Sequence, residues 1–168
     1  MTANRTEGPH SRAACSPSRA LNRTERDVWL GFLYTHLQLL RKLDKTLMDS
    51  QGIPTSSYEV LLTLSEAPEG RLRMKDVAAS LVISRSGLTR IVDDLERKGY
   101  VERQKCPTDA RGLDAVLTDN GWKAFRRARK VHLTHLRGEF LDKLSEEQLR
   151  ALDEIWRTIG LDQPLDED

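Results

Sequence analysis

Two short apolar stripes, followed at once by a change of hydrophobic period, constrain the fold of this 168-residue chain more than any other feature. Large apolar side chains recur at spacings of three and four residues in 74–81 and again in 88–95, which predicts two short helices that each bury one face. Only Val82, Ile83 and Ser84 separate them, and Ser84 is a favourable helix N-cap. Two short helices with such a tight connection form a helix-turn-helix.

After Gly99 apolar and polar residues alternate, which indicates β-strands. We expect strands at 100–104 and 113–117, joined by a polar, turn-rich loop at 105–112. A third, short strand is expected at 71–73, where it would pair at the edge of the hairpin. A β-hairpin that directly follows a helix-turn-helix is a wing.

Longer helices are expected on both sides of this region. Apolar residues at helical spacing predict a first helix over 22–50, which Gly52 ends. Ser56 and Glu59 have the spacing of a capping box and predict the start of a second helix. Residues 1–20 carry almost no large apolar side chain, so we expect a disordered arm there.

The C-terminal part is predicted to be helical again. One apolar stripe runs from Thr118 to Leu144 and predicts a long helix. Ser145 and Gln148 have capping-box spacing and predict a last helix. The buried face of that helix is expected to hold Leu149, Leu152, Ile155, Trp156 and Ile159.

Charge is distributed unevenly along the chain, although the formal net charge is only +1. Residues 71–111 carry a net charge of +4, whereas residues 145–168 carry −6. Positive charge therefore concentrates in the predicted helix-turn-helix and hairpin, where a polyanion would dock.

The solvent face of the second short helix suits a DNA major groove. Arginine matches the O6 and N7 acceptors of guanine, while serine and threonine hydroxyls contact bases or phosphates. A helix that only needed to be soluble would be expected to carry Glu/Lys pairs on this face. The side chains that we expect to contact DNA from this helix are Ser84, Arg85, Ser86, Thr89 and Arg90.

The predicted hairpin adds further positive charge through Arg103, Lys105 and Arg111. Arg111 is placed at the loop tip, and an extended arginine fits a narrow minor groove, where negative potential is concentrated. Asp109 could orient the Arg111 guanidinium through a bidentate pair, or the pair could stiffen the loop. We include all four residues in the predicted DNA-binding site.

Two segments resemble the MarR family of winged helix-turn-helix transcriptional regulators. Residues 74–78 and 84–103 are similar to the recognition segment of that family. Its wing motif, Asp-x-Arg followed by an apolar strand that ends in Leu-Thr-x-x-Gly, is similar to residues 109–121. The similarity extends over about residues 22–160, and the two motifs together are far more specific than either alone.

The resemblance implies a homodimer with two winged heads that binds pseudo-palindromic promoter DNA and usually represses transcription. It also implies, for many members, release of DNA when a small, often aromatic, effector fills a pocket between the head and the dimer helices. Trp29, His36 and Tyr58 are our candidates for that pocket, with an ordinary place in the core as the alternative.

These patterns together predict a mainly α (α+β) fold, in which N- and C-terminal helices form a dimerisation region beside a winged helix-turn-helix head. A single copy has little else to cover the apolar stripes of the terminal helices, so we expect a second copy to cover them, with packing on their own head as the alternative. The expected parts are a disordered N-terminal arm at 1–20, a dimerisation helix at 21–53, the winged helix-turn-helix DNA-binding region at 54–118, and C-terminal dimerisation helices at 119–168.

Two alternatives to this interpretation stay open. One is a winged-helix protein-interaction module without DNA readout, although Arg85, Arg90 and Arg111 on one face argue against it. The other is a redox-responsive regulator that uses Cys106. His132 and His135 are three residues apart, and His36 could lie near them in the fold. These histidines do not complete a metal-ligand set, so we expect no metal and no cofactor.

Other function classes find little support in the sequence. No phosphate-binding glycine loop, nucleophile elbow or His-Glu-x-x-His motif is present, so we expect no enzyme activity and no catalytic residues. No stretch approaches the roughly 18 apolar residues that a membrane span needs. The lone Cys15 and Cys106 fit a reducing compartment, and we expect a cytoplasmic protein without a membrane partner.

Overall fold

The structure is a computed structural model that describes residues 19–106 and 109–159, and at 109–111 it describes the backbone alone. The chain divides into two units, Met1–Thr35 and His36–Asp168. The boundary falls within the first helix. Most of the predicted arm at 1–20 lies outside the described residues.

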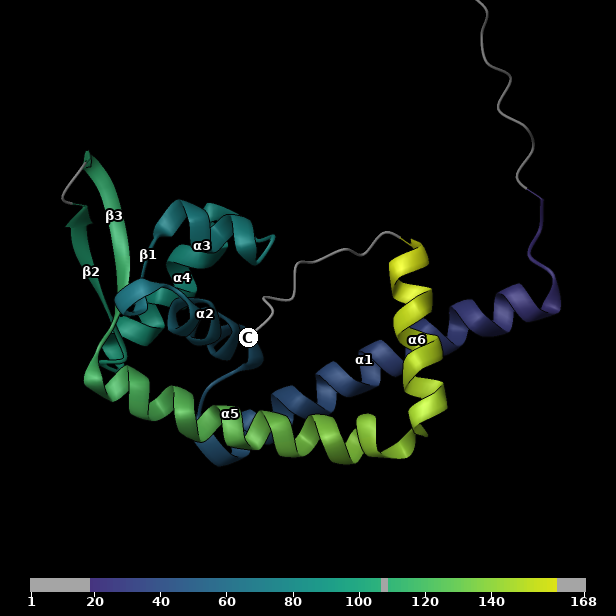
Figure 1. Cartoon of the computed structure of the whole chain (residues 1–168). Helices are drawn as coiled ribbons and strands as arrows, with labels where there is room; N and C mark the ends of the chain where they lie inside the picture. Colours follow the sequence, from purple (N-terminus) through teal and green to yellow (C-terminus); the bar gives the residue numbers. More distant parts are fainter. Residues whose placement is uncertain (1–18, 107–108, 160–168) are drawn as a thin grey trace, which may run out of the picture. The chain divides into compact units, whose positions relative to one another are not determined.

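Eleven elements follow one another in the described part of the chain (Figure 1): α1 (Arg23–Gln51), α2 (Thr55–Glu66), η1 (Pro68–Gly70), β1 (Arg71–Arg73), α3 (Met74–Ser80), α4 (Arg85–Arg97), β2 (Val101–Cys106), β3 (Asp109–Leu117), α5 (Asp119–Glu139), η2 (Leu141–Lys143) and α6 (Glu146–Ile159). The predicted mainly α fold with one small sheet is confirmed. None of the described helices has the length and apolarity needed to cross a membrane.

The predicted helix-turn-helix consists of α3 and α4, which pack against each other and against α2. The apolar stripe of α4 is almost completely buried at Leu88, Val92 and Leu95. Burying side chains of this size stabilises the fold by about 1.5–3 kcal/mol each. Because these three side chains turn one face of α4 into the core, the opposite face of the helix is exposed to solvent.

A left-handed glycine turns the chain from α4 into the sheet. Gly99 has φ 68°, a conformation that is costly for residues with a side chain. The Gly99 amide donates to the Glu96 carbonyl at 2.9 Å, and the Tyr100 amide donates to the Leu95 carbonyl at 2.9 Å. This is the Schellman arrangement, which satisfies the last carbonyls of the helix and directs the chain into β2.

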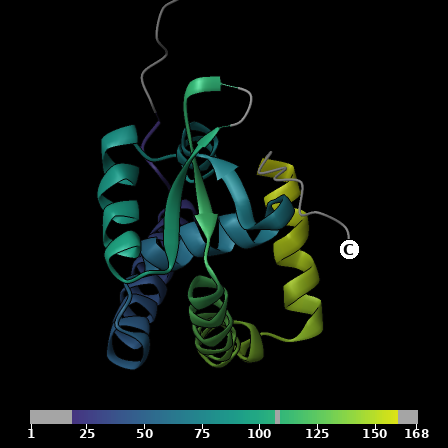
Figure 2. The same cartoon turned by 90° about the vertical axis from the view of Figure 1, so that its left-hand side faces the viewer.

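The sheet has the strand order β1-β3-β2 with both pairs antiparallel, so the predicted edge position of β1 is confirmed. The β2–β3 hairpin projects beyond the helices of the head (Figures 1 and 2). The strands are longer than predicted, because cross-strand pairing continues past a bulge at Lys105/Cys106 to the pair Cys106↔Asp109. The predicted loop at 105–112 is therefore mostly strand.

Two helix boundaries differ from prediction. Ser56 and Glu59 do not form a capping box, because α2 begins at Thr55 with Pro54 as its N-cap, two residues earlier than that box requires. The Thr55 amide instead donates to the Asp44 carboxylate of α1 at 2.8 Å. The predicted long helix to Leu144 was also wrong in its end, since α5 stops at Glu139 and a 3-10 turn follows.

The turn between α3 and α4 holds a β-branched residue in an unfavourable backbone conformation. Val82 has φ 52° and a side chain that is 90% exposed, so strain is not offset by burial. We expect Val82→Asn to raise the free energy of unfolding by on the order of 1 kcal/mol, because asparagine tolerates this region. Urea denaturation checks this, and an unchanged or lower midpoint would contradict it.

Candidate nucleic-acid interface

The exposed face of α4 carries the side chains that the sequence predicts for DNA contact. The N-cap at Ser84 is confirmed, since its hydroxyl accepts from the Gly87 amide at 3.1 Å. Arg85 and Arg90 are exposed, and neither forms an ion pair with any residue that the structure describes. Two uncompensated guanidinium groups on a rigid, capped helix are available to an anionic partner.

The hydroxyl side chains of the same face are partly engaged within the helix. The Thr89 hydroxyl donates to the Arg85 carbonyl at 2.8 Å, which leaves its methyl group and its lone pairs for a partner. The Ser86 and Ser84 hydroxyl oxygens lie 3.2 Å apart. The helix thus orients these short side chains before any ligand binds, which lowers the entropy cost of a contact.

Arg103 of β2 lies against α4 with its side chain only 19% exposed. Its guanidinium donates to the Asp93 carboxylate at 2.6 Å and to the Thr89 carbonyl at 3.2 Å, and it also pairs with Glu96. The Glu96 carboxylate accepts from the Arg103 amide as well, at 2.9 Å. Arg103 therefore ties the hairpin to the recognition helix, while its predicted contact with DNA stays a prediction.

We expect Arg103→Gln to lower the free energy of unfolding by about 1–3 kcal/mol, because charge-assisted bonds to two carboxylates are lost together. The matched control is Lys105→Gln, which removes an exposed charge two residues along the same strand. Its stability should stay within about 0.5 kcal/mol of the wild type. Equal urea midpoints for the two variants would show that the Arg103 contacts do not contribute to the free energy of unfolding.

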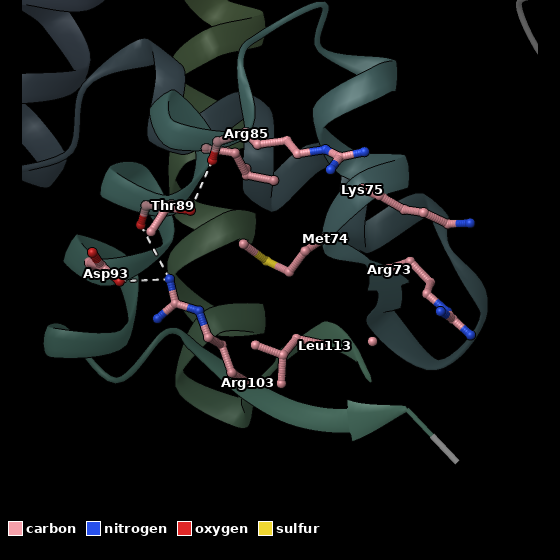
Figure 3. A pocket seen from close by; sticks show the side chains of 10 residues that line it. Arg73, Met74, Lys75, Arg85, Thr89, Asp93, Arg103 and Leu113 are labelled. Atoms are coloured by element: carbon pink, nitrogen blue, oxygen red, sulfur yellow. Dashed lines mark hydrogen bonds and ion pairs between the residues drawn. The ribbon is translucent and has the colours of Figure 1, made fainter. Parts of the chain in front are cut away.

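A cleft of about 490 Å³ opens between α4, the start of α3 and the hairpin (Figure 3). Four cationic side chains line it, together with one acidic side chain that is already paired with Arg103. Lys75 and Arg85 make no ion pair with described residues. The lining residues are Arg73, Met74, Lys75, Arg85, Leu88, Thr89, Asp93, Arg103, Gly112 and Leu113.

Arg73 and Lys75 were missed by the sequence interpretation as candidate site residues. They belong to the basic run at 71–75, whose charge was noted only as part of a longer region. Arg73 and Arg71 approach the buried Asp114 carboxylate of β3 at 3.9 and 3.8 Å. Two arginines around one buried carboxylate hold β1 against the base of the hairpin.

The outer part of the hairpin is only partly described. Lys105 is exposed on β2, as a residue that contacts a phosphate would be. The side chains of Asp109 and Arg111 lie outside the described residues, although their backbone belongs to β3. Their predicted pairing and the predicted minor-groove contact of Arg111 are therefore untested.

The three residues predicted for an effector pocket differ in their surroundings. Tyr58 is buried, and its ring stacks on His132 with centroids 4.7 Å apart. Burial raises the pKa of the Tyr58 hydroxyl and lowers the pKa of His132, so both groups are neutral near pH 7. Trp29 and His36 are exposed in this single chain. The cleft of Figure 3 is not lined by any of these three.

The redox-responsive alternative gains no support from the described residues. Cys106 is buried and forms no disulfide with them, whereas an oxidant sensor needs an accessible thiolate. Cys15 lies outside the described residues. Within the described ranges, no three His, Cys, Asp or Glu side chains come together as a metal site.

An exposed, capped recognition helix beside a projecting hairpin defines a winged helix-turn-helix protein of the DNA-binding class. Comparison with known proteins supports this class. The sequence profile of the MarR family matches residues 51–112. Among solved structures, AbsC from Streptomyces coelicolor, a MarR family transcriptional regulator, is 34% identical with a TM-score of 0.80, over 85% of this chain and 96% of that one.

Two further relatives agree with this result. Sco3205 from Streptomyces coelicolor, a MarR family transcriptional regulator solved in complex with DNA, is 37% identical with a TM-score of 0.80, over 89% of this chain and 94% of that one. The HTH-type transcriptional regulator PrsX of Escherichia coli is 32% identical over 134 residues, which are 76% of this chain and 71% of PrsX. The chain belongs to the MarR family of transcriptional regulators.

Proposed function

We propose that this protein is a homodimeric, sequence-specific DNA-binding repressor that recognises pseudo-palindromic promoter sites and responds to a small, often aromatic, effector. The observation that carries the proposal is the exposed face of α4, where Arg85 and Arg90 have no ion-pair partner among the described residues. In this proposal Arg90 and Arg85 contact bases or phosphates, Ser84, Ser86 and Thr89 assist, and Arg111 enters the minor groove.

Exposed apolar side chains support the homodimer. Helix α6 has no buried residue, and α1 buries only Leu43 and Leu47. Large apolar side chains that a second copy could cover, each more than 40% exposed within His36–Asp168, are Leu37, Leu40, Met48, Leu133, Ile155 and Ile159. A two-fold axis between such helices would place two recognition helices in successive major grooves, about 34–36 Å apart.

Repression is supported by the names of relatives. MprA of Escherichia coli strain K12, named a transcriptional repressor, is 27% identical over 137 residues, which are 80% of this chain and 68% of MprA. A dimer that occupies a promoter blocks polymerase. An effector that changes the distance between the two heads would weaken binding, because both half-sites must be engaged together. Trp29, His36 and Tyr58 remain the proposed contacts for that effector.

Selection of genomic DNA fragments with purified protein tests the proposal. We expect the wild type to enrich a palindromic sequence, and Arg90→Ala to bind that sequence more weakly by about 1–3 kcal/mol, which is about 5- to 150-fold. The matched control is Arg97→Ala on the same helix, whose guanidinium is already paired with Asp94 at 2.9 Å. Failure of the wild type to enrich any sequence would favour a protein-interaction module instead.

A further inference from the structure

Helix α5 carries four cationic side chains on one exposed face, and this group is called the basic stripe. Its members are Lys123, Arg126, Arg127 and Lys130. Each lies three or four residues from two of the others, so the four neighbour one another on the helix surface. All four are exposed, and none forms an ion pair or hydrogen bond with a residue that the structure describes.

Several cations on the exposed faces of α1 and α6 have a different environment from those of the basic stripe. Four cations on α1 and α6 each pair with an acidic residue four positions away: Arg23, Lys45, Arg150 and Arg157. Between Asp119 and Glu139, by contrast, α5 contains no acidic residue at all. Like charges at these spacings destabilise a helix, so the basic stripe lowers the stability of the free protein. The need for a soluble surface alone does not explain four adjacent cations without acidic partners among the described residues.

The basic stripe lies away from the recognition face. The opposite side of α5 buries Ala124, Phe125 and Ala128 and packs on α2, while α4 packs on α2 as well. Figure 1 shows α5 below α2, with α3 on the other side of α2. The basic stripe is on the side of α5 opposite its contact with α2, so it faces away from α2.

The expected dimer surface also leaves the basic stripe uncovered. The only large apolar side chain of α5 that is highly exposed among the described residues is Leu133, beyond the C-terminal end of the stripe. No exposed apolar residue interrupts the stripe itself. A charged surface without an apolar centre suits a hydrated polyanion better than a second protein copy.

We propose that the basic stripe binds the phosphate backbone of duplex DNA outside the site that the recognition helix reads, without sequence preference. The four cations span about 10 Å of helix axis, given a rise of about 1.5 Å per residue. Duplex DNA presents one phosphate per about 1.7 Å of its axis, so several phosphates lie within that span. Such a contact would hold flanking DNA or a second duplex against the dimer.

Binding to a random-sequence duplex of about 60 bp, several helical turns long, tests the proposal as a function of salt. The test variant replaces all four stripe cations with glutamine. Its log K against log salt is expected to be shallower by about 2–4, since each lost phosphate contact removes about 0.9 from the slope. Its thermal unfolding temperature should be unchanged or higher, because like-charge repulsion is removed, so weaker binding would not reflect unfolding.

Two controls make the result specific to the basic stripe. Replacing Arg23, Lys45, Arg150 and Arg157 with glutamine changes the net charge equally but removes paired cations, and its slope should stay near that of the wild type. The charge-conserving exchange Lys123→Arg with Arg127→Lys should retain wild-type binding. Equal slopes for the two fourfold glutamine variants would overturn the proposal.

The basic stripe and sequence-specific regulation can fail independently of each other. If fragment selection finds no preferred sequence while the stripe variant still loses salt-dependent binding, sequence-specific regulation fails and this inference stands. If the wild type selects a palindrome but the stripe variant binds random DNA as tightly as the wild type, only this inference fails.

Discussion

Replacing Ile155 with aspartate is expected to convert the protein into monomers and to lower affinity for a two-half-site operator by on the order of 10²- to 10⁴-fold. Ile155 is 48% exposed in a helix that has no buried residue in the single chain. In the proposed dimer this side chain is covered by the second copy, so a carboxylate there would be buried without a partner. Affinity falls because one head alone engages one half-site.

Sedimentation velocity gives the association state of this variant, and titration with the selected operator gives its affinity. The matched control is Arg150→Gln, which changes the net charge by the same amount on the charged side of α6, where Arg150 pairs with Glu146 at 3.5 Å. The control should remain dimeric. An Ile155→Asp protein that is still dimeric and binds as the wild type would place the interface elsewhere.

Gly121→Ala is expected to lower the free energy of unfolding by about 3 kcal/mol, the upper end of the usual cost of overpacking, because the added Cβ would meet backbone. A Cβ at this position would lie 1.9 Å from the Tyr100 carbonyl oxygen. That carbonyl accepts from the Thr118 amide at 3.1 Å, and the Thr118 hydroxyl accepts from the Gly121 amide at 3.0 Å. Neither segment can move without breaking the junction between the hairpin and α5.

The control for this prediction lies on the same helix. A Cβ at Gly138 would meet no described atom within 4 Å, and the backbone there is helical, so Gly138→Ala should raise the free energy of unfolding by about 0.5–1 kcal/mol. Urea denaturation of both variants measures the contrast. Similar midpoints for the two alanine variants would contradict the close approach at Tyr100.

Local signals in the sequence predicted most of the head. The caps at Ser84 and Ser145 were predictable because the side chain and its acceptor or donor lie within three residues of each other. The exposed face of α4 followed from its period, since three apolar residues on one side leave Arg85 and Arg90 on the other.

The errors have a common physical cause, which is contact between residues distant in sequence. The start of α2 depends on a carboxylate from α1, at Asp44, and Glu139 at the end of α5 accepts from Lys42 at 2.6 Å. The Lys42 and Lys143 ammonium groups lower the pKa of Glu139 to about 2. The residues next to Arg103 in the sequence do not indicate that its ion-pair partners, Asp93 and Glu96, lie on α4. Such contacts cannot be read from helical or strand periodicity.

Hydroxyl-radical footprinting of the wild-type protein on a selected genomic fragment tests sequence-specific binding by a symmetric dimer. We expect two protected segments related by two-fold symmetry, with centres one helical turn or a multiple of it apart, about 10–10.5 bp per turn. A single unsymmetrical segment, or protection spread evenly along the fragment, would contradict a dimer that reads two half-sites.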